Sequence, residues 1–377
     1  MRPLQGALVE GTATVAPAAA TDESDLLLRA ARGDVTARTP VWLMRQAGRY
    51  MKAFRAYSEK YPFRMRSETP EIATELSLQC WRAFGVDGVI MFSDILTILP
   101  ALGVEFDVVP GKGPAICDTL RSESRVAEYE LAVDRFAPSD QLPFVGETLR
   151  ALRQETEGKT TLVGFVGAPW TLAAYAVEGG ASRHALEIKG MMHSNPTLAH
   201  DLLAATSDAV ARYACHQIEN GAQMVQLFES WAHHLSPADF SEFAKPYAQR
   251  VARYVNDRHP DVPLIFFANG GSSYLELQRE MVAPDAFSAL SIDWAVDLAT
   301  ARTVLGEGTP IQGNVDPSLL LASPDAVDAA VERCIAQAGG PGNRHILNLG
   351  HGVLQQTPEA NVAAFVNAAK NHGIRRS

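Results

Sequence analysis

The chain has 377 residues and a net charge of −10, and it is 47% hydrophobic and 20% charged. This composition can bury a full core, so it excludes a wholly disordered chain. The acidic balance excludes a nucleic-acid or anionic-membrane binder that works through its global charge, and no stretch of about 18 apolar residues could span a membrane. An anionic small molecule held in a local basic cleft remains compatible with this charge.

The first residues, 1–24, are rich in Ala, Thr, Pro and Gly and lack the apolar core of a signal peptide. We expect a disordered tail there, followed by one domain over residues 25–377. The cysteines are scattered with no C-x-x-C pair, which favours free thiols in a reducing compartment and a cytoplasmic location. They are Cys80, Cys117, Cys215 and Cys334.

Proline marks the start of five expected helices, each time after a residue that favours the cap position. Four of these segments run into a glycine that would end the helix, and one ends near a proline instead. The starts are Thr69-Pro70, Asn195-Pro196, Ser236-Pro237, Ser323-Pro324 and Thr357-Pro358, and the stops are Gly85, Gly221, Pro260, Gly339 and Gly373.

Short apolar runs of strand length lie between the helices. They are continuous rather than alternating, as parallel strands covered on both faces require. Eight such runs interleaved with helices predict an α/β fold, a (β/α)8 TIM barrel in a single domain. The runs are residues 41–44, 88–92, 162–167, 224–228, 264–268, 289–292, 310–314 and 346–350.

The long gap between the second and third runs predicts an insertion around residues 100–158. Within it, VEFDVV and GPAI are separated by Pro110-Gly111-Lys112-Gly113, which predicts a small hairpin. An open doubly wound sheet is the alternative architecture for the same alternation. Its nucleotide-binding fingerprints, G-x-G-x-x-G and G-x-x-x-x-G-K-[ST], are missing from the sequence.

Functional residues of such a barrel lie at the carboxyl ends of the strands. Arg45 and Arg49 follow the first run in MRQAGRYM, where two guanidinium groups could grip a carboxylate or phosphate. The alternative is a solvated surface pair. Asp94 follows the second run and could accept N–H donors or stabilise a cation; a helix cap or an arginine partner is the alternative.

Three further candidates follow later runs. Tyr175 could donate its phenol into the rim, and Ser230 lies in no recognisable triad or G-x-S-x-G motif, which disfavours a hydrolase nucleophile. His351 lies between two glycines in LGHGV. The glycine backbone there could instead bind a phosphate, and the histidine could simply make a structural hydrogen bond.

Two absences also narrow the chemistry. No lysine lies at the end of an expected strand, which disfavours a Schiff-base or pyridoxal enzyme. No cluster of histidine, cysteine and carboxylate residues has metal-ligand spacing, so we expect no catalytic metal.

Taken together, several of these segments resemble the uroporphyrinogen decarboxylase family of haem biosynthesis. The matching stretches occur in the expected order between about residues 38 and 360, and Arg-Gln-Ala-Gly-Arg-Tyr is the most specific of them. They are PVWLMRQAGRYM, MFSDIL, GFVGAPWTLAAYAVEGG, QLFESWAHHLSP, FANGG, IQGNVDP and LNLGHGV.

The resemblance implies a (β/α)8 barrel, commonly a homodimer, that needs no cofactor or metal. It implies conversion of the four acetate side chains of uroporphyrinogen III to methyl groups, which gives coproporphyrinogen III and CO2. Matched by motif, the functional positions of the family are Arg45, Arg49, Asp94, Tyr175, Ser230 and His351.

Two other functions are kept as alternatives. A zinc-dependent corrinoid methyltransferase of the same superfamily would need thiol and imidazole ligands at strand ends, and none of the cysteines is expected there. A non-catalytic tetrapyrrole carrier would have lost its site, whereas the arginine pair and Asp94 are present.

Overall fold

The computed structural model describes residues 23–109, 111 and 113–376. The expected tail, 1–24, therefore lies outside the described residues except for Glu23 and Ser24. Among the described residues, no helix is both long and apolar enough to cross a membrane.

In the described part of the chain, seven strands form one parallel sheet in the order β1-β4-β5-β6-β7-β8-β9. Strands that are neighbours in the sheet follow one another along the chain, apart from a hairpin between the first two, as repeated right-handed β-α-β connections require. The strands are β1 (Gly88–Ile90), β4 (Thr161–Gly167), β5 (Met224–Glu229), β6 (Leu264–Ala268), β7 (Ala289–Ser291), β8 (Ile311–Val315) and β9 (His345–Leu349). Every expected run from the second to the eighth thus forms a strand, and all but one residue of these strands is buried.

The sheet is curled, and a chain of buried side chains crosses its concave side. Gln312 of β8 donates from Nε2 to Oε1 of Gln226 of β5 at 3.0 Å, although the two strands are not neighbours. Gln312 also accepts from the indole N–H of Trp42 at 2.9 Å. Because these side chains meet across the interior, the two edges of the sheet bend toward one another.

The first expected strand, 41–44, is not a ladder strand but one isolated parallel bridge, Val41 to Leu347. The segment nevertheless lies between the edge strands β9 and β1. On one side, Leu347 N donates to the carbonyl of Pro40 at 2.8 Å, and on the other Asp87 N donates to the carbonyl of Val41 at 2.7 Å. The prediction of a regular strand was therefore wrong, because Asp87 Oδ2 and Asn348 Oδ1 accept the Val41 and Met44 N–H groups in place of strand carbonyls.

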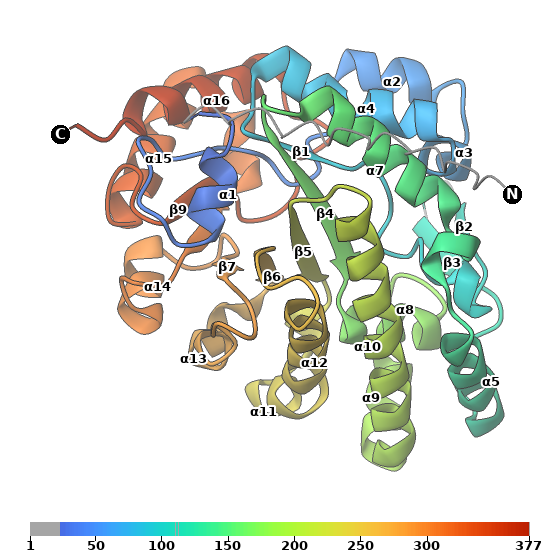
Figure 1. Cartoon of the computed structure of the whole chain (residues 1–377). Coiled ribbons are helices and arrows are strands. Elements are labelled where there is room, and N and C mark those ends of the chain that lie inside the picture. Colours follow the sequence, from blue (N-terminus) through green and yellow to red (C-terminus); the bar gives the residue numbers. More distant parts are fainter. Residues whose placement is uncertain (1–22, 110, 112, 377) are drawn as a thin grey trace, which may run out of the picture.

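The helices lie around the outside of the sheet, and Figure 1 shows α10 beside α12 below it and α4 beside α7 above it. The proline starts are confirmed at α4 (Pro70–Phe84), α10 (Pro196–Glu219), α11 (Pro237–Asp239) and α15 (Pro324–Gln337). At α16 (Glu359–His372) the cap is Pro358 itself, one residue later than expected. The other helices of this layer are α1 (Leu26–Ala31), α2 (Lys52–Ser58), α3 (Phe63–Glu68), α7 (Pro143–Thr156), α8 (Pro169–Glu178), α9 (Leu186–Ser194), α12 (Lys245–Asn256), α13 (Leu275–Arg279) and α14 (Leu298–Leu305).

The insertion after β1 contains the expected hairpin. Strands β2 (Phe106–Val109) and β3 (Gly113–Ile116) pair antiparallel with Phe106 opposite Ile116. Two helices, α5 (Glu123–Asp134) and α6 (Pro138–Gln141), complete it before α7 returns the chain to the sheet. The remaining elements are short 3₁₀ helices and one π-helix, η3: η1 (Pro100–Leu102), η2 (Ala232–His234), η3 (Phe240–Ala244), η4 (Gly271–Tyr274) and η5 (Pro317–Leu321).

Candidate active site

The six candidate residues all follow the carboxyl end of a strand or of the 41–44 segment. Arg45 and Arg49 lie in the connection from residue 44 to α2, and Asp94 lies just after β1. Tyr175 is on α8, directly after β4. Ser230 and His351 follow β5 and β9. Parallel strands end at the same edge, so this connectivity brings the six residues to one end of the sheet.

Arg45 has an unusual backbone conformation, with a φ of 60° in a residue other than glycine. Its side chain passes directly over the loop that carries His351. A Cβ on Gly352 would lie only 2.3 Å from Cδ of Arg45, so a larger residue at 352 would clash with it. The left-handed backbone and this close contact hold the guanidinium group in a defined place over the end of the sheet.

The charge of Arg45 acts on three other candidate residues. Burial raises the pKa of Asp94, and the Leu96 N–H and Arg45 oppose that rise. Burial, followed by the charge of Arg45, lowers the pKa of His351 to about 4. Burial also raises the pKa of Tyr175, and Arg45 is among the groups that oppose it. These four side chains therefore lie within electrostatic reach of one another, and His351 is neutral near pH 7.

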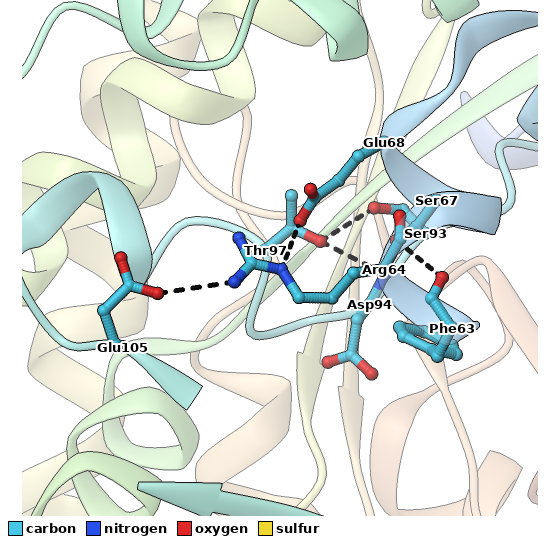
Figure 2. Close-up of polar contacts among 8 residues, drawn as sticks. All are labelled: Phe63, Arg64, Ser67, Glu68, Ser93, Asp94, Thr97 and Glu105. Carbon is cyan, nitrogen blue, oxygen red and sulfur yellow. Dashed lines mark hydrogen bonds and ion pairs between the residues drawn. The ribbon is translucent and has the colours of Figure 1, made fainter. Parts of the chain in front are cut away.

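One of the two carboxylate oxygens of Asp94 accepts a hydrogen bond from its own loop. Oδ1 accepts the backbone N–H of Leu96 at 2.8 Å, while the hydroxyl of Thr97 accepts the N–H of Asp94 at 3.3 Å and pairs with the hydroxyl of Ser93 at 2.9 Å. Figure 2 shows the carboxylate pointing away from the nearby pair of Arg64 and Glu68. The second oxygen has no hydrogen-bond or ion-pair partner among the described residues, so it is available to a ligand.

Both arginines of the pair are exposed, and neither guanidinium group has a hydrogen bond or ion pair with any residue that the structure describes. The backbone that carries them is held more firmly, because Arg55 donates to the carbonyls of Arg49 at 2.9 Å and of Tyr50 at 2.8 Å. An unpaired guanidinium fork on a fixed loop is suited to binding a carboxylate in two-point contact.

Tyr175 and Ser230 lie on the β4 and β5 side of the site. The ring of Tyr175 packs against Trp231, with ring centroids 4.5 Å apart. Asn269 fixes the neighbouring backbone by donating from Nδ2 to the carbonyl of Ser230 at 3.0 Å. The Ser230 hydroxyl is half-buried and has no partner among the described residues. Both hydroxyl groups are thus placed to donate to a ligand.

Together, the site offers two unpaired cationic forks, one carboxylate with a free oxygen, and three neutral donors. Such a set can hold several carboxylates at its rim and stabilise one cation at its centre. In the described part of the chain, no group of three or more histidine, cysteine or carboxylate side chains is arranged to hold a metal ion.

A family model described as uroporphyrinogen decarboxylase (URO-D) matches residues 22–372. The chain belongs to the uroporphyrinogen decarboxylase family. A relative of that name from Picosynechococcus is 49% identical over 352 residues, which covers 93% of this chain and 98% of the relative. Another, from Nostoc punctiforme, is 51% identical over 345 residues and covers 91% of this chain and 95% of the relative.

Solved structures support the fold at lower identity. A methyltransferase from Methanosarcina mazei superposes with a TM-score of 0.74 at 20% identity, covering 93% of this chain and 99% of that one. A B12-independent methionine synthase from Shewanella gives a TM-score of 0.52 at 10% identity, with 81% and 86% coverage. At these identities the likeness concerns the α/β fold alone.

In this member of the uroporphyrinogen decarboxylase family, one buried acid beside the site was not selected from the sequence. Glu229, the last residue of β5, is fully buried and accepts a hydrogen bond from the hydroxyl of Thr171. The Thr171 hydroxyl in turn accepts a hydrogen bond from the backbone N–H of Trp231 at 3.1 Å. The ring of Trp231 packs against the ring of Tyr175. The signal in the sequence is a carboxylate at the end of a mostly apolar run. Its second oxygen has no partner among the described residues.

Burial raises the pKa of Glu229 from 4.5 to about 8, which makes stability depend on pH. Between about pH 5 and pH 8 the unfolded chain ionises this group while the folded protein keeps it protonated, so stability falls as pH rises through that range. Glu229→Gln keeps the acceptor for Thr171 and removes the titration. The quantity to measure is the melting temperature of the variant minus that of the parent. We expect this difference to be more positive at pH 8 than at pH 5, by about 4 °C or more. Equal differences at both pH values would contradict this explanation.

Proposed function

We propose that this chain removes the carboxyl groups of the four acetate side chains of uroporphyrinogen III, giving coproporphyrinogen III and four CO2 without a cofactor or metal. The observation that carries the proposal is the family match over residues 22–372, combined with an unpaired arginine pair beside a half-free Asp94. The chain is then a carboxy-lyase of tetrapyrrole biosynthesis.

The chemistry explains why an acid belongs at the centre of the site. Loss of CO2 from an acetate on a pyrrole leaves an electron pair that needs a sink, and a protonated pyrrole carbon supplies one as an iminium-like cation. The free oxygen of Asp94 would accept pyrrole N–H groups, and its charge would stabilise that cation. Burial raises the pKa of the carboxyl group, so binding a cationic intermediate relieves the cost of its charge.

The remaining candidates would hold the carboxylates. Arg45 and Arg49 would each grip one in two-point contact, and one of the two would also relay the proton. Tyr175, Ser230 and neutral His351 would donate hydrogen bonds to further carboxylates. An uncharged imidazole fits this role because its burial beside Arg45 disfavours protonation.

We also propose the finer architecture expected from the sequence. The 40–44 segment, which hydrogen-bonds to β9 and to the residue before β1, would take the place of the eighth strand of a (β/α)8 barrel. Residues 25–377 would form that single domain, and the protein would act in the cytoplasm as a homodimer. Light scattering tests the last point, because a homodimer has twice the chain mass of 40.7 kDa.

The alternatives have less support. The structural likeness to a methyltransferase is at 20% identity and concerns the fold, whereas relatives named uroporphyrinogen decarboxylase are about half identical over more than nine tenths of the chain. A tetrapyrrole carrier would not need a site that combines an acid with two arginines whose guanidinium groups are unpaired among the described residues.

One experiment tests the proposal and separates all three functions. The purified protein is incubated without oxygen with uroporphyrinogen III, with and without EDTA, and the products are separated by carboxyl count. We expect a four-carboxylate product and four CO2 per substrate in both samples. A loss of activity in EDTA would contradict the metal-free chemistry, and bound but unchanged substrate would indicate a carrier.

A further inference from the structure

A third arginine near the site has no acidic partner in the part of the chain that the structure describes. Arg66, on α3, packs its guanidinium group over the rings of Phe63 and Phe54, with Cζ at 5.4 Å and 5.7 Å from the two ring centroids. Its Nε is buried and has no hydrogen-bond acceptor among the described residues. Ring contacts hold the planar group in place, but they do not satisfy an N–H donor.

Two acidic residues on or near α3, Glu68 and Glu105, pair with a different arginine. Arg64, two residues earlier on α3, pairs with Glu68 at 2.7 Å and with Glu105 at 3.4 Å. Figure 2 shows this pair and the Asp94 loop in one view. Arg66 has no such ion pair among the described residues, so its orphaned Nε is not explained by a protein contact.

The rings beneath Arg66 connect it to the active site. Phe54 and Phe63 each pack against Phe92, with ring centroids 5.5 Å and 6.0 Å apart. Phe92 lies two residues before Asp94, in the loop that follows β1. A rigid aromatic base therefore fixes the guanidinium group of Arg66 relative to the catalytic loop.

Arg66 also lies near the second arginine of the pair. Burial lowers the pKa of Arg66, and the charge of Arg49 lowers it further. Two cationic groups that repel one another are stabilised when an anion binds to both. An anion bound by both would lie between α3 and the loop that carries Arg49, rather than on the carboxylate of Asp94.

We infer that Arg66 and Arg49 together bind one carboxylate of the tetrapyrrole, and that this carboxylate belongs to a propionate side chain. The inference rests on the proposed function. Propionates stay on the ring through all four decarboxylations, so a peripheral site for one of them holds the substrate throughout and leaves the acetates free to react at Asp94. Arg66 is thus a substrate-binding residue for this reaction.

The test compares two variants on the same helix. Arg66→Gln removes the unpaired cation, whereas Arg64→Gln removes an equal charge that is already paired with Glu68. We expect Arg66→Gln to raise KM for uroporphyrinogen III about tenfold with kcat within about twofold, and Arg64→Gln to leave both within about twofold. An unchanged KM in Arg66→Gln, or equal effects in the two variants, would overturn the inference.

Coproporphyrinogen III, which keeps the four propionates but has no acetates, identifies the arm that is bound. Its inhibition constant should rise by the same factor as KM in Arg66→Gln. If only KM rises, the bound arm is an acetate and the propionate assignment is wrong. Arg66→Lys keeps the charge and the aliphatic part of the side chain, so it tests the inference even if the glutamine variant does not fold. Its KM should lie between those of the parent and Arg66→Gln. If neither the parent nor Arg64→Gln releases CO2, the proposed function fails, independently of Arg66.

Discussion

Replacing Asp94 with asparagine is expected to lower kcat about a hundredfold or more while KM stays within about threefold. The asparagine side chain keeps the oxygen that accepts the Leu96 N–H at 2.8 Å, so the loop after β1 keeps its shape. What is lost is the negative charge that faces the cationic intermediate. Steady-state kinetics with uroporphyrinogen III under anaerobic conditions measure both parameters.

Asp316 provides a matched control for this variant. It follows β8, and its Oδ1 accepts the N–H of Ser318 at 2.8 Å, the same two-residue turn that Asp94 makes with Leu96. Asp316→Asn therefore removes one charge from the same turn geometry and should leave kcat and KM close to the parent values. Near-normal turnover in Asp94→Asn would remove this carboxylate from the mechanism.

Arg45→Lys and Arg49→Lys should each lower kcat/KM about thirtyfold or more, equivalent to about 2 kcal/mol of transition-state binding. A lysine keeps the charge but presents it as a point, so it cannot hold two carboxylate oxygens at once.

Arg64→Lys is the control, since a lysine can still pair with Glu68 at the surface. Activity close to the parent is expected there, and the melting temperature of all three variants reports whether the fold is intact. If Arg45→Lys or Arg49→Lys turns over substrate as fast as the parent does, two-point contact is not why these positions carry arginine.

Much of the candidate site could be read from residue order alone. In a parallel α/β sheet the carboxyl ends of all strands share one edge, so polar residues that follow buried runs must gather there. That reasoning places Asp94, Ser230 and His351 at one end of the sheet, where the structure has them. It works because continuous apolar runs and cap-proline pairs are local signals that long-range contacts seldom override.

Tertiary structure alone decided the features that depend on contacts between distant segments. The 41–44 run is apolar enough for a strand, yet side chains of Asp87 and Asn348 take its N–H groups and leave a single bridge. The raised pKa of Glu229 likewise arises from its complete burial, whereas the sequence shows only that it follows a mostly apolar run.

Arg64 and Arg66 illustrate the same limit. They are two residues apart on one short helix, and helical spacing suggests the pair of Arg64 with Glu68 but not the ring contacts of Arg66. In the folded protein one pairs with Glu68 and Glu105, while the other lies on aromatic rings beside Arg49 with a buried donor unmet. Sequence thus determined which residue types reach the end of the sheet, and packing decided which charges are neutralised there and which are left to bind a substrate.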